Sequence, residues 1–362
     1  MGQGVLKPGW ILGPRGDALI FTGPIVVGLG LVWLGQQLGI LDTEVPPWAF
    51  ALLIVGVDVA HVYSTAFRVY LDPEELGRRP GLYLGIPLVC LLGGVLLHTQ
   101  GADVFWRALA YLAVFHFVRQ QWGWIAYTRR SAGEGDEDRL LDKLAIYAAT
   151  LYPLLHWHTH LPRSFEWFLA GDFVSLPARI DPYVHGLHWA ILITFLGRQA
   201  QRAATGRGVN LAKLQVLVTT WIAWYVGIVV LASDIAFTTL NVLSHGVPYL
   251  AVVWRIERQR WDGERGALAK LFRPRLWFVF LGLLVLAGYG EEWLWDRLVW
   301  HERPGLFPGF GPELGATLLS FVVPLLALPQ ATHYVLDGWI WKFRANEDVR
   351  SLLKPNRPSG LG

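Results

Sequence analysis

The sequence predicts an all-α protein: a polytopic transmembrane helical bundle of about ten spans, with both termini cytoplasmic. Hydrophobic residues make up 53% of the 362 residues and charged residues 16%, whereas soluble domains average about a quarter charged. Apolar runs of about 20 residues, the length that crosses a bilayer, recur along the whole chain. Basic residues gather in alternate connections between these runs, as expected for a protein with several spans.

The apolar runs give the candidate spans 18–40, 47–71, 81–98, 103–127, 140–160, 181–200, 210–233, 235–256, 275–296 and 313–342. Proline and glycine mark several of their ends, as in RRPG, EVPP and FRPR. No small-residue cleavage site follows the first run, so we expect an uncleaved span there. Residues 1–345 are then a single transmembrane helical domain, and 346–362 are expected to form a disordered cytoplasmic tail.

The connections with basic residues predict the orientation. One alternate set contains Lys7 and Arg15, Arg78 and Arg79, Arg129 to Arg139, Arg198 to Lys213, Arg255 to Arg275, and Lys342 to Arg357. The opposite set is poor in basic residues, so the positive-inside rule places both termini in the cytoplasm. We expect an inner or cytoplasmic membrane location, with 163–180 at the outer interface and 258–275 as a basic cytoplasmic loop.

Charge and cysteine content argue against a nucleic-acid-binding protein and against a protein held together by disulfides or cysteine-bound zinc. The net charge of +3 comes from basic residues in short loops, where topology explains them, so we expect no nucleic-acid partner. A single cysteine, Cys90, excludes an internal disulfide and a cysteine-rich zinc site.

Four histidines lie deep in predicted spans, each with a second polar residue about one helical turn away. The pairs are Asp58 with His61, His116 with Gln120, Asn241 with His245, and His333 with Asp337. An ionised group at the centre of a span costs about 2.5–3.5 kcal/mol, and such groups are usually functional. A divalent cation would use the imidazoles as ligands and offset the carboxylate charge.

The sequence therefore predicts a buried metal centre with ligands His61, His116, His245, His333, Asp58 and Asp337. Asp58 and Asp337 are also expected to take part in catalysis. The expected cofactor is non-haem iron, one or two ions, with zinc, manganese or haem as alternatives. Predicted substrate-binding residues are Arg68, Arg119, Gln120 and Asn241, the arginines for an anionic headgroup. Glu291 and Glu292, at an outer helix end, are expected to be solvated.

Other histidines lie near the outer ends of their spans and define a second, outer candidate site. They are His98, His156, His158, His160, His185 and His188. In a helix His156 and His160 share a face, while His158 points elsewhere. The alternative is that these residues are hydrated side chains at the membrane boundary.

Two short stretches resemble a known family. DVAH (Asp58, His61) and SHGVPYLAVVW (His245, Pro248) are similar in style to the bacteriorhodopsin-related carotene dioxygenases, multi-histidine membrane enzymes with non-haem iron. Fatty-acid desaturases contain adjacent histidine pairs in HxxHH boxes, and this chain has no such pair. The resemblance implies iron and an apolar substrate.

The favoured hypothesis is an integral membrane metalloenzyme that oxidises a lipid or isoprenoid by hydroxylation, desaturation or oxidative cleavage, with an electron donor as a further partner. One alternative is a haem-binding electron-transfer protein. Others are a proton-coupled transporter with His–Asp relays and a structural subunit whose buried polar groups only join helices.

Overall fold

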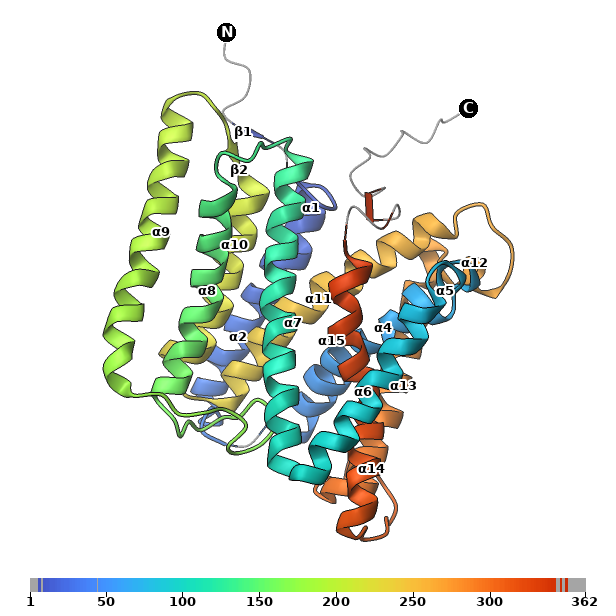
Figure 1. The fold of residues 1–362 in the computed structure, drawn as a ribbon. Helices are drawn as coiled ribbons and strands as arrows, with labels where there is room; N and C mark the ends of the chain where they lie inside the picture. The colour runs from blue at the N-terminus through green and yellow to red at the C-terminus, as the bar shows by residue number, and fades with distance from the viewer. Residues whose placement is uncertain (1–5, 8, 44, 343–345, 347–348, 351–362) are drawn as a thin grey trace.

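The structure, a computed structural model, describes residues 6–7, 9–43, 45–342, 346 and 349–350, and most of these residues are helical (Figure 1). In chain order the helices are α1 (Pro14–Asp17), η1 (Ala18–Thr22), α2 (Gly23–Gln37), α3 (Pro47–Ala49), η2 (Phe50–Val59), α4 (Ala60–Thr65), η3 (Ala66–Tyr70), α5 (Pro73–Arg78), α6 (Pro80–Gln100), α7 (Ala102–Ser131), α8 (Arg139–Thr159), η4 (Ala178–Ile180), α9 (Asp181–Ala204), α10 (Leu211–Trp224), η5 (Tyr225–Val230), α11 (Asp234–Arg260), α12 (Ala267–Leu271), η6 (Pro274–Leu276), α13 (Trp277–Trp295), η7 (Asp296–Trp300), α14 (Ala316–Leu326) and α15 (Leu328–Ile340). Two short segments, β1 (Leu6–Lys7) and β2 (Val209–Asn210), pair in parallel.

The all-helical fold confirms the predicted class, and six helices within the described residues are long and apolar enough to cross a membrane. They are Pro14–Gln37, Pro47–Tyr70, Pro80–Gln100, Leu211–Val230, Asp234–Arg260 and Pro274–Trp300. The run expected at 313–342 consists of two helices, α14 and α15, bent by 41° and together a seventh candidate. Helices α7, α8 and α9 have sufficient length but carry more polar residues. The count of ten spans therefore stays a prediction.

Local sequence explains where several helices begin. Proline occupies the first turn of α3, α5 and α6, where its missing N–H leaves no bond unmade. The side chain of Asp72 accepts hydrogen bonds from the first turn of α5, Asn210 caps α10 and Ser233 caps α11. These side chains therefore define where α5, α10 and α11 begin.

Helices α7 and α11 lie between two groups of helices. In Figure 1, α8, α9 and α10 lie on one side, and α4, α6, α13 and α15 on the other, while α11 runs obliquely between them. Helix α7 packs against both α8 and α15, and α11 packs against both α2 and η2. Of the six candidate spans, α11 is the most buried. Polar side chains on the inward faces of α7 and α11, such as His116 and His245, are therefore buried inside the protein.

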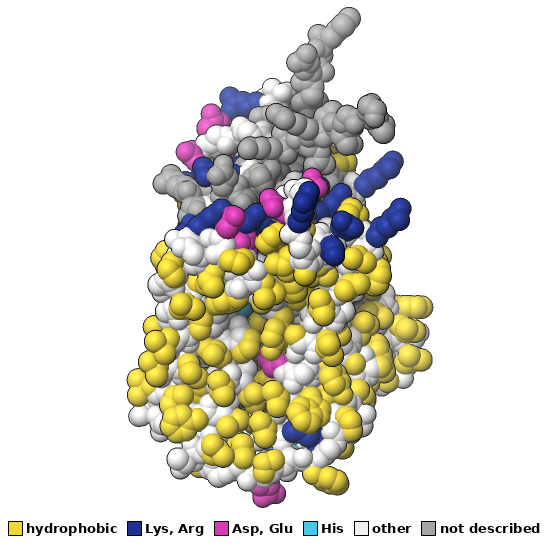
Figure 2. Space-filling model, turned by 90° about the vertical axis from the view of Figure 1, so that its right-hand side faces the viewer, with side chains coloured by type: hydrophobic (Ala, Val, Ile, Leu, Met, Phe, Trp, Pro, Cys, Tyr) yellow, Lys and Arg dark blue, Asp and Glu magenta, His cyan; other side chains and the backbone are white. Residues whose placement is uncertain are grey.

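The outer surface has the charge distribution of a membrane protein. On the face that Figure 2 shows, apolar side chains cover the body of the bundle and most Lys and Arg side chains gather at one end, the end that carries α5 and α12 in Figure 1. Large apolar side chains exposed on this body include Val26, Leu84, Ile193 and Leu286. An apolar belt with a basic end is what a bilayer-spanning bundle presents to lipid and to one aqueous side.

Buried ion pairs join helices at the basic end. Lys213 is fully buried, and its Nζ lies 3.0 Å from Oδ2 of Asp142. The side chain of Asp138 accepts hydrogen bonds from Arg198 at 2.8 Å and Arg202 at 2.7 Å. Burial alone would raise the pKa of Asp138, but its bonds to the two arginines outweigh burial and lower that pKa below its ordinary value.

The segments predicted not to span have different structures. The loop 163–180 is irregular up to η4, and its Phe165 and Phe173 pack on Trp157, so it covers the end of α8. Within 258–275 the chain continues α11 to Arg260 and then forms α12. Most of the predicted tail 346–362 lies outside the described residues, but Asn346 and Val349 are buried.

Candidate metal centre

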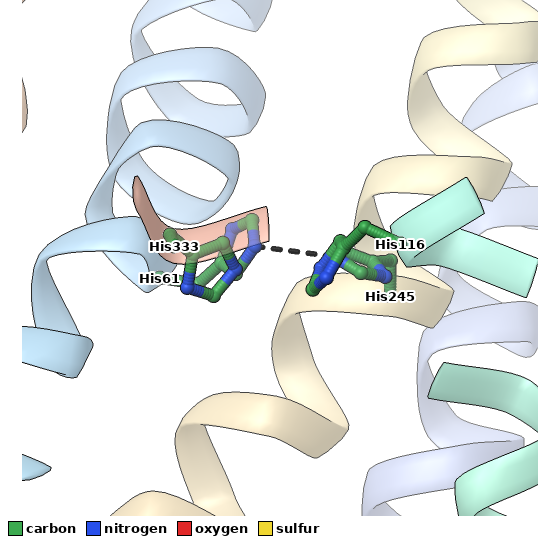
Figure 3. Close-up of side chains that lie close together, drawn as sticks. All are labelled: His61, His116, His245 and His333. Carbon is green, nitrogen blue, oxygen red and sulfur yellow. Dashed lines mark hydrogen bonds between the residues drawn. The ribbon is translucent and has the colours of Figure 1, made fainter. Parts of the chain in front are cut away.

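Four histidines from four helices meet inside the bundle. His61 comes from α4, His116 from α7, His245 from α11 and His333 from α15 (Figure 3). Each is at most 3% exposed, and one ring nitrogen from each lies within 4.8 Å of the others. Nε2 of His245 is 3.2 Å from Nε2 of His116 and 3.1 Å from Nε2 of His61.

The four imidazoles form a closed ring of neighbours, called here the four-histidine ring. Their centroids are 4.7 Å apart for His61 and His245, 5.0 Å for His245 and His116, 4.7 Å for His116 and His333, and 4.8 Å for His333 and His61. Neighbouring ring planes are inclined by 61° to 84°. These are edge-to-face arrangements and not parallel stacks, and one nitrogen of each imidazole lies within 4.8 Å of the others.

The nitrogen spacing suits metal ligands. Imidazole nitrogens bind zinc at about 2.0–2.1 Å, so neighbouring ligands lie about 2.9 Å apart at right angles and about 3.4 Å apart in a tetrahedron. The observed spacings of 3.1 and 3.2 Å fall between these values. The pairs His116–His245 and His61–His245 are therefore already spaced like ligands of one metal ion.

Hydrogen bonding alone leaves the ring incompletely satisfied. Nε2 of His333 is buried and makes no hydrogen bond among the described residues. Nε2 of His245 meets two other Nε2 atoms, although a neutral imidazole nitrogen either donates or accepts. A buried polar atom without a partner costs about 1–3 kcal/mol. One cation at the centre would use all four nitrogens.

The opposite nitrogens of His333 and His116 face other polar groups, whereas Nδ1 of His245 and Nδ1 of His61 make no hydrogen bond among the described residues. Nδ1 of His333 lies 2.7 Å from Oγ1 of Thr65. Nδ1 of His116 lies 3.6 Å from Oδ2 of Asp337, whose Oδ1 accepts a 2.7 Å hydrogen bond from the hydroxyl of Tyr249. Metal-bound histidines commonly donate their second N–H to such a partner, which fixes the tautomer and the ring orientation.

Packing brings the helices close enough for this convergence. A Cβ on Gly246 would lie 2.6 Å from Cγ1 of Val57, so α11 approaches η2 closely because residue 246 is glycine. This approach places His245, the preceding residue, against His61. On its other side His245 stacks on Phe117 at 3.6 Å between centroids, which fixes its ring plane.

The two predicted acidic ligands lie beside the ring and not within the group of converging nitrogens. Oδ1 of Asp58 is 3.8 Å from Nδ1 of His61, and Oδ1 of Asp337 is 3.8 Å from Nδ1 of His333. Both carboxyls thus face the outer edge of an imidazole. From there their charges can offset that of a cation, while four neutral imidazoles supply the nearest donors.

The predicted substrate-binding residues are dispersed. Arg68 is buried in an ion pair with Glu257 at 2.9 Å, and Arg119 donates to the hydroxyl of Tyr147 at 3.0 Å. The side-chain amides make bonds to α11: Nε2 of Gln120 lies 3.4 Å from the carbonyl oxygen of His245, and Asn241 bonds within its own helix to Phe237. The structure does not bring these four side chains together.

The outer histidines also separate into different environments. His158 and His188 each have both ring nitrogens engaged, His158 with the Leu154 carbonyl and Tyr111, and His188 with the Ala148 carbonyl and Trp221. His185 accepts a hydrogen bond from Trp189, and His98 packs on Phe105. Of the six, His156 and His160 are brought together, joined by Asp181.

The expectation that Glu291 is solvated is wrong. Its side chain is 4% exposed and accepts hydrogen bonds from Trp295 and Gln330, each at 3.3 Å. Glu291 was misplaced because α13 continues through η7 to Trp300, which puts the residue inside the span and not at its end.

Sequence reasoning missed Tyr249, Phe117 and Asp181. Tyr249 lies four residues after His245, so helical spacing places it on the same face and could have identified it. Phe117 directly follows His116, and adjacent residues do not share a helix face. No sequence signal connects Asp181 with His156, because a loop of irregular structure separates them.

Comparison with protein-family models, curated proteins and solved structures gives no match. The function therefore has to be argued from the geometry of the four-histidine ring.

Proposed function

We propose that the four-histidine ring binds a catalytic non-haem iron ion and that the protein is an integral membrane oxidoreductase acting on a lipid or isoprenoid. The observation that carries this proposal is the convergence of four buried imidazoles from four helices, with Nε2 of His333 left without a hydrogen bond. Buried polar clusters that only join helices usually satisfy their own hydrogen bonds. A cation at the centre would give Nε2 of His333 a partner, whereas Nδ1 of His61 and Nδ1 of His245, which point away from the centre, are also buried without a hydrogen bond among the described residues.

The donor set favours iron over the alternatives. Neutral imidazole suits iron, zinc, copper and nickel, whereas manganese prefers oxygen donors. Zinc held by four protein side chains is typically a closed structural site. Four nitrogens leave a six-coordinate iron ion open positions. Bound there, iron supplies the ability to bind and activate dioxygen.

A haem group fits the ring poorly. Two axial histidines of a haem lie on opposite faces of a wide macrocycle. Here each imidazole contacts two other imidazoles, with centroid separations of 4.7 to 5.0 Å. A porphyrin plane would have to separate these contacts, so we propose a bare metal ion.

The protein's own side chains would position the ligands. With Nε2 of His333 toward the metal, Nδ1 carries the proton and donates to Thr65. Asp337, held by Tyr249, provides negative charge beside His116 and His333. Asp58 does the same beside His61. The two carboxylates would neutralise the charge of a divalent cation, and the four neutral imidazoles would supply its ligand atoms. This lowers the free-energy cost of burying the cation.

The surroundings support an apolar substrate that arrives from the bilayer. The ring lies among helices whose outer faces are apolar (Figure 2). Arg68 is occupied by Glu257, which argues against its use for an anionic headgroup. We propose hydroxylation, desaturation or oxidative cleavage of a lipid or isoprenoid. The first two reactions need an external electron donor, whereas cleavage that consumes both oxygen atoms does not.

The basic end of the bundle supports a cytoplasmic position for that end, and we propose an inner or cytoplasmic membrane. By the positive-inside rule the connections with α5 and α12 would face the cytoplasm. With ten spans both termini would lie on that side. Cysteine substitution and labelling from either side of intact cells, at Arg265 and at Glu313, would test this orientation.

Metal analysis tests the centre. Purified protein is expected to hold about one equivalent of iron, and His116→Ala and His333→Ala are expected to hold a tenth or less. His158→Ala, a buried histidine outside the ring, is the matched control and should keep the metal. Equal metal in all four proteins would contradict the proposal.

A second measurement tests the reaction. Lipids extracted from cells that express the wild type or His245→Ala are compared by mass spectrometry, together with oxygen uptake when purified protein receives those lipids. We expect an oxygenated or cleaved apolar product with the wild type alone. If the protein binds iron but gives neither product nor oxygen uptake, the proposed metal centre is retained and the proposed oxidation is overturned.

One observation favours a second candidate, a proton-coupled transporter. Asp58, whose side chain is 32% exposed, adjoins His61, and the ring continues to Asp337 and Tyr249. Polar groups in contact can relay protons through a membrane protein. Metal-free protein that moves protons across proteoliposomes, with the activity lost in Asp58→Asn, would favour this function over the oxidoreductase.

A further inference from the structure

The end of α8 and the start of α9 bring two histidines and an aspartate together, away from the four-histidine ring. His156 and His160 lie one turn apart at the end of α8, and Asp181 is the first residue of α9. One ligand atom from each side chain lies within 4.8 Å of the others. The imidazoles are stacked, with centroids 3.9 Å apart and planes inclined by 26°.

The hydrogen bonds of this group leave donor atoms available. Nδ1 of His156 lies 3.0 Å from Oδ1 of Asp181, and Nδ1 of His160 lies 2.9 Å from the carbonyl oxygen of His156. The Nε2 atoms of both imidazoles have no hydrogen-bond partner among the described residues. His158 and His188 nearby differ in this respect, because both of their ring nitrogens are engaged.

The environment favours a cation at these donors. Stacked imidazoles would repel each other if both were protonated, and the carboxylate of Asp181 supplies negative charge beside them. The neighbouring Arg163 donates its Nη2 to the carbonyl of Leu231, which directs that end of its guanidinium elsewhere. His156 and Asp181 are 12% and 17% exposed, so water and ions can reach the group.

We propose that His156, His160 and Asp181 bind a borderline divalent cation such as Zn²⁺, Ni²⁺ or Cu²⁺, with water in the remaining positions. Two imidazole nitrogens and a carboxylate oxygen are ordinary ligands for these ions. The cation would join α8 to α9 at the end of the bundle opposite the basic connections. The site is separate from the four-histidine ring and does not depend on the proposed function.

Zinc titration of the purified full-length protein in detergent tests the site. Protein first stripped with a membrane-compatible chelator is titrated with Zn²⁺, and bound zinc is counted by mass spectrometry after dialysis. We expect wild type to bind one equivalent more than His160→Ala or Asp181→Asn. His185→Ala, a neighbouring histidine outside the group, is the matched control and should bind like the wild type.

The two sites are distinguished by their variants. His116→Ala disrupts the four-histidine ring and should keep the outer zinc, whereas His160→Ala should keep the inner metal. With Cu²⁺ as probe, nitrogen hyperfine coupling in the electron paramagnetic resonance spectrum should weaken in His160→Ala within the His116→Ala background. Size-exclusion profiles and helical circular dichroism establish that each variant is folded.

Zinc should also stabilise the wild type, because an ion that binds the folded state raises its melting temperature. That rise should be lost in Asp181→Asn and kept in His185→Ala. The proposal is overturned if His160→Ala and Asp181→Asn bind zinc as wild type does, or if His185→Ala loses as much zinc as they do.

Discussion

Replacing Thr65 by valine removes a hydroxyl that holds one imidazole of the four-histidine ring while preserving the shape of the side chain. Thr65 is 4% exposed, and its Oγ1 lies 2.7 Å from Nδ1 of His333. If Nε2 of His333 binds the proposed metal, Nδ1 carries the proton and is expected to donate to this oxygen. In Thr65→Val that N–H is buried without its partner, and His333 loses the contact that sets its orientation.

The expected loss can be given a magnitude. Removal of an outer hydrogen-bond partner of a metal-bound histidine typically lowers metal affinity about 10- to 100-fold, which corresponds to about 1.4–2.7 kcal/mol. The loss should be smaller than that of His333→Ala, because the valine variant keeps the ligand itself. Thr65→Ser, which retains the hydroxyl, should recover most of the affinity.

The assay is an anaerobic competition between purified protein and a coloured iron chelator. Thr150→Val is the matched control: Thr150 is fully buried, but its hydroxyl bonds to backbone carbonyls of its own helix, α8. We expect wild type and Thr150→Val to compete equally, Thr65→Val less well and His333→Ala least. If Thr65→Val matched the wild type while His333→Ala lost the metal, His333 would not bind through Nε2 with Thr65 behind it.

Further substitutions probe the charge, the packing and the ion pairs. Asp337→Asn keeps the acceptor for Tyr249 but removes a charge beside the ring, so metal affinity in the same competition assay should fall about 10- to 100-fold. Gly246→Ala places a methyl group 2.6 Å from the Val57 side chain, and overpacking of about 1–3 kcal/mol should lower the melting temperature and the metal content together. Lys213→Met removes one of the two cations that pair with buried Asp142 and Glu134, Arg129 being the other, and should lower the free energy of unfolding by about 1–3 kcal/mol. The fold lowers the pKa of Asp138. Its carboxylate should therefore stabilise the protein above the ordinary carboxyl pKa of about 4, and this stabilisation should be lost as the pH falls through the lower folded value. In a series of melting temperatures measured against pH, Asp138→Asn should lack this acid-dependent loss.

The convergence of His61, His116, His245 and His333 was predictable because depth in a membrane can be counted. Each span has boundaries that the sequence marks, and a helix rises about 1.5 Å per residue. Histidines at similar depth on different helices of one bundle avoid lipid by facing the bundle interior, where they lie close together. Helical spacing also places Thr65 on the same face as His61, because positions four apart align.

The inner arrangement of the site was not predictable in the same way. Helical spacing puts Asp337 one turn from His333, but side-chain rotamers decide which nitrogen the carboxyl meets, and these depend on Tyr249 from another helix. The close approach at Gly246 likewise depends on Val57, which no pattern within α11 reveals. Spacing and depth therefore predicted that the four histidines meet, but not which of their polar neighbours lie beside them or which atoms face the centre.

For the outer histidines, by contrast, the sequence did not predict which residues come together. In HWHTH the residues His156, His158 and His160 alternate, and sequence alone leaves open whether they share a site. The helix continues to Thr159, so His158 turns toward Tyr111 and away from its neighbours. Asp181 lies beside His156 and His160 because the loop 161–180 returns the chain to the end of α8. No local sequence pattern predicts this contact.

The most direct test of the central claim is X-ray absorption spectroscopy at the iron edge of the purified protein. The four-histidine ring predicts about four nitrogen scatterers at about 2.0–2.2 Å with the outer-shell pattern of imidazole, and loss of this signal in His116→Ala. A protein without iron, or iron whose spectrum shows no imidazole and is unchanged in His116→Ala, would contradict a metal centre built by these four histidines.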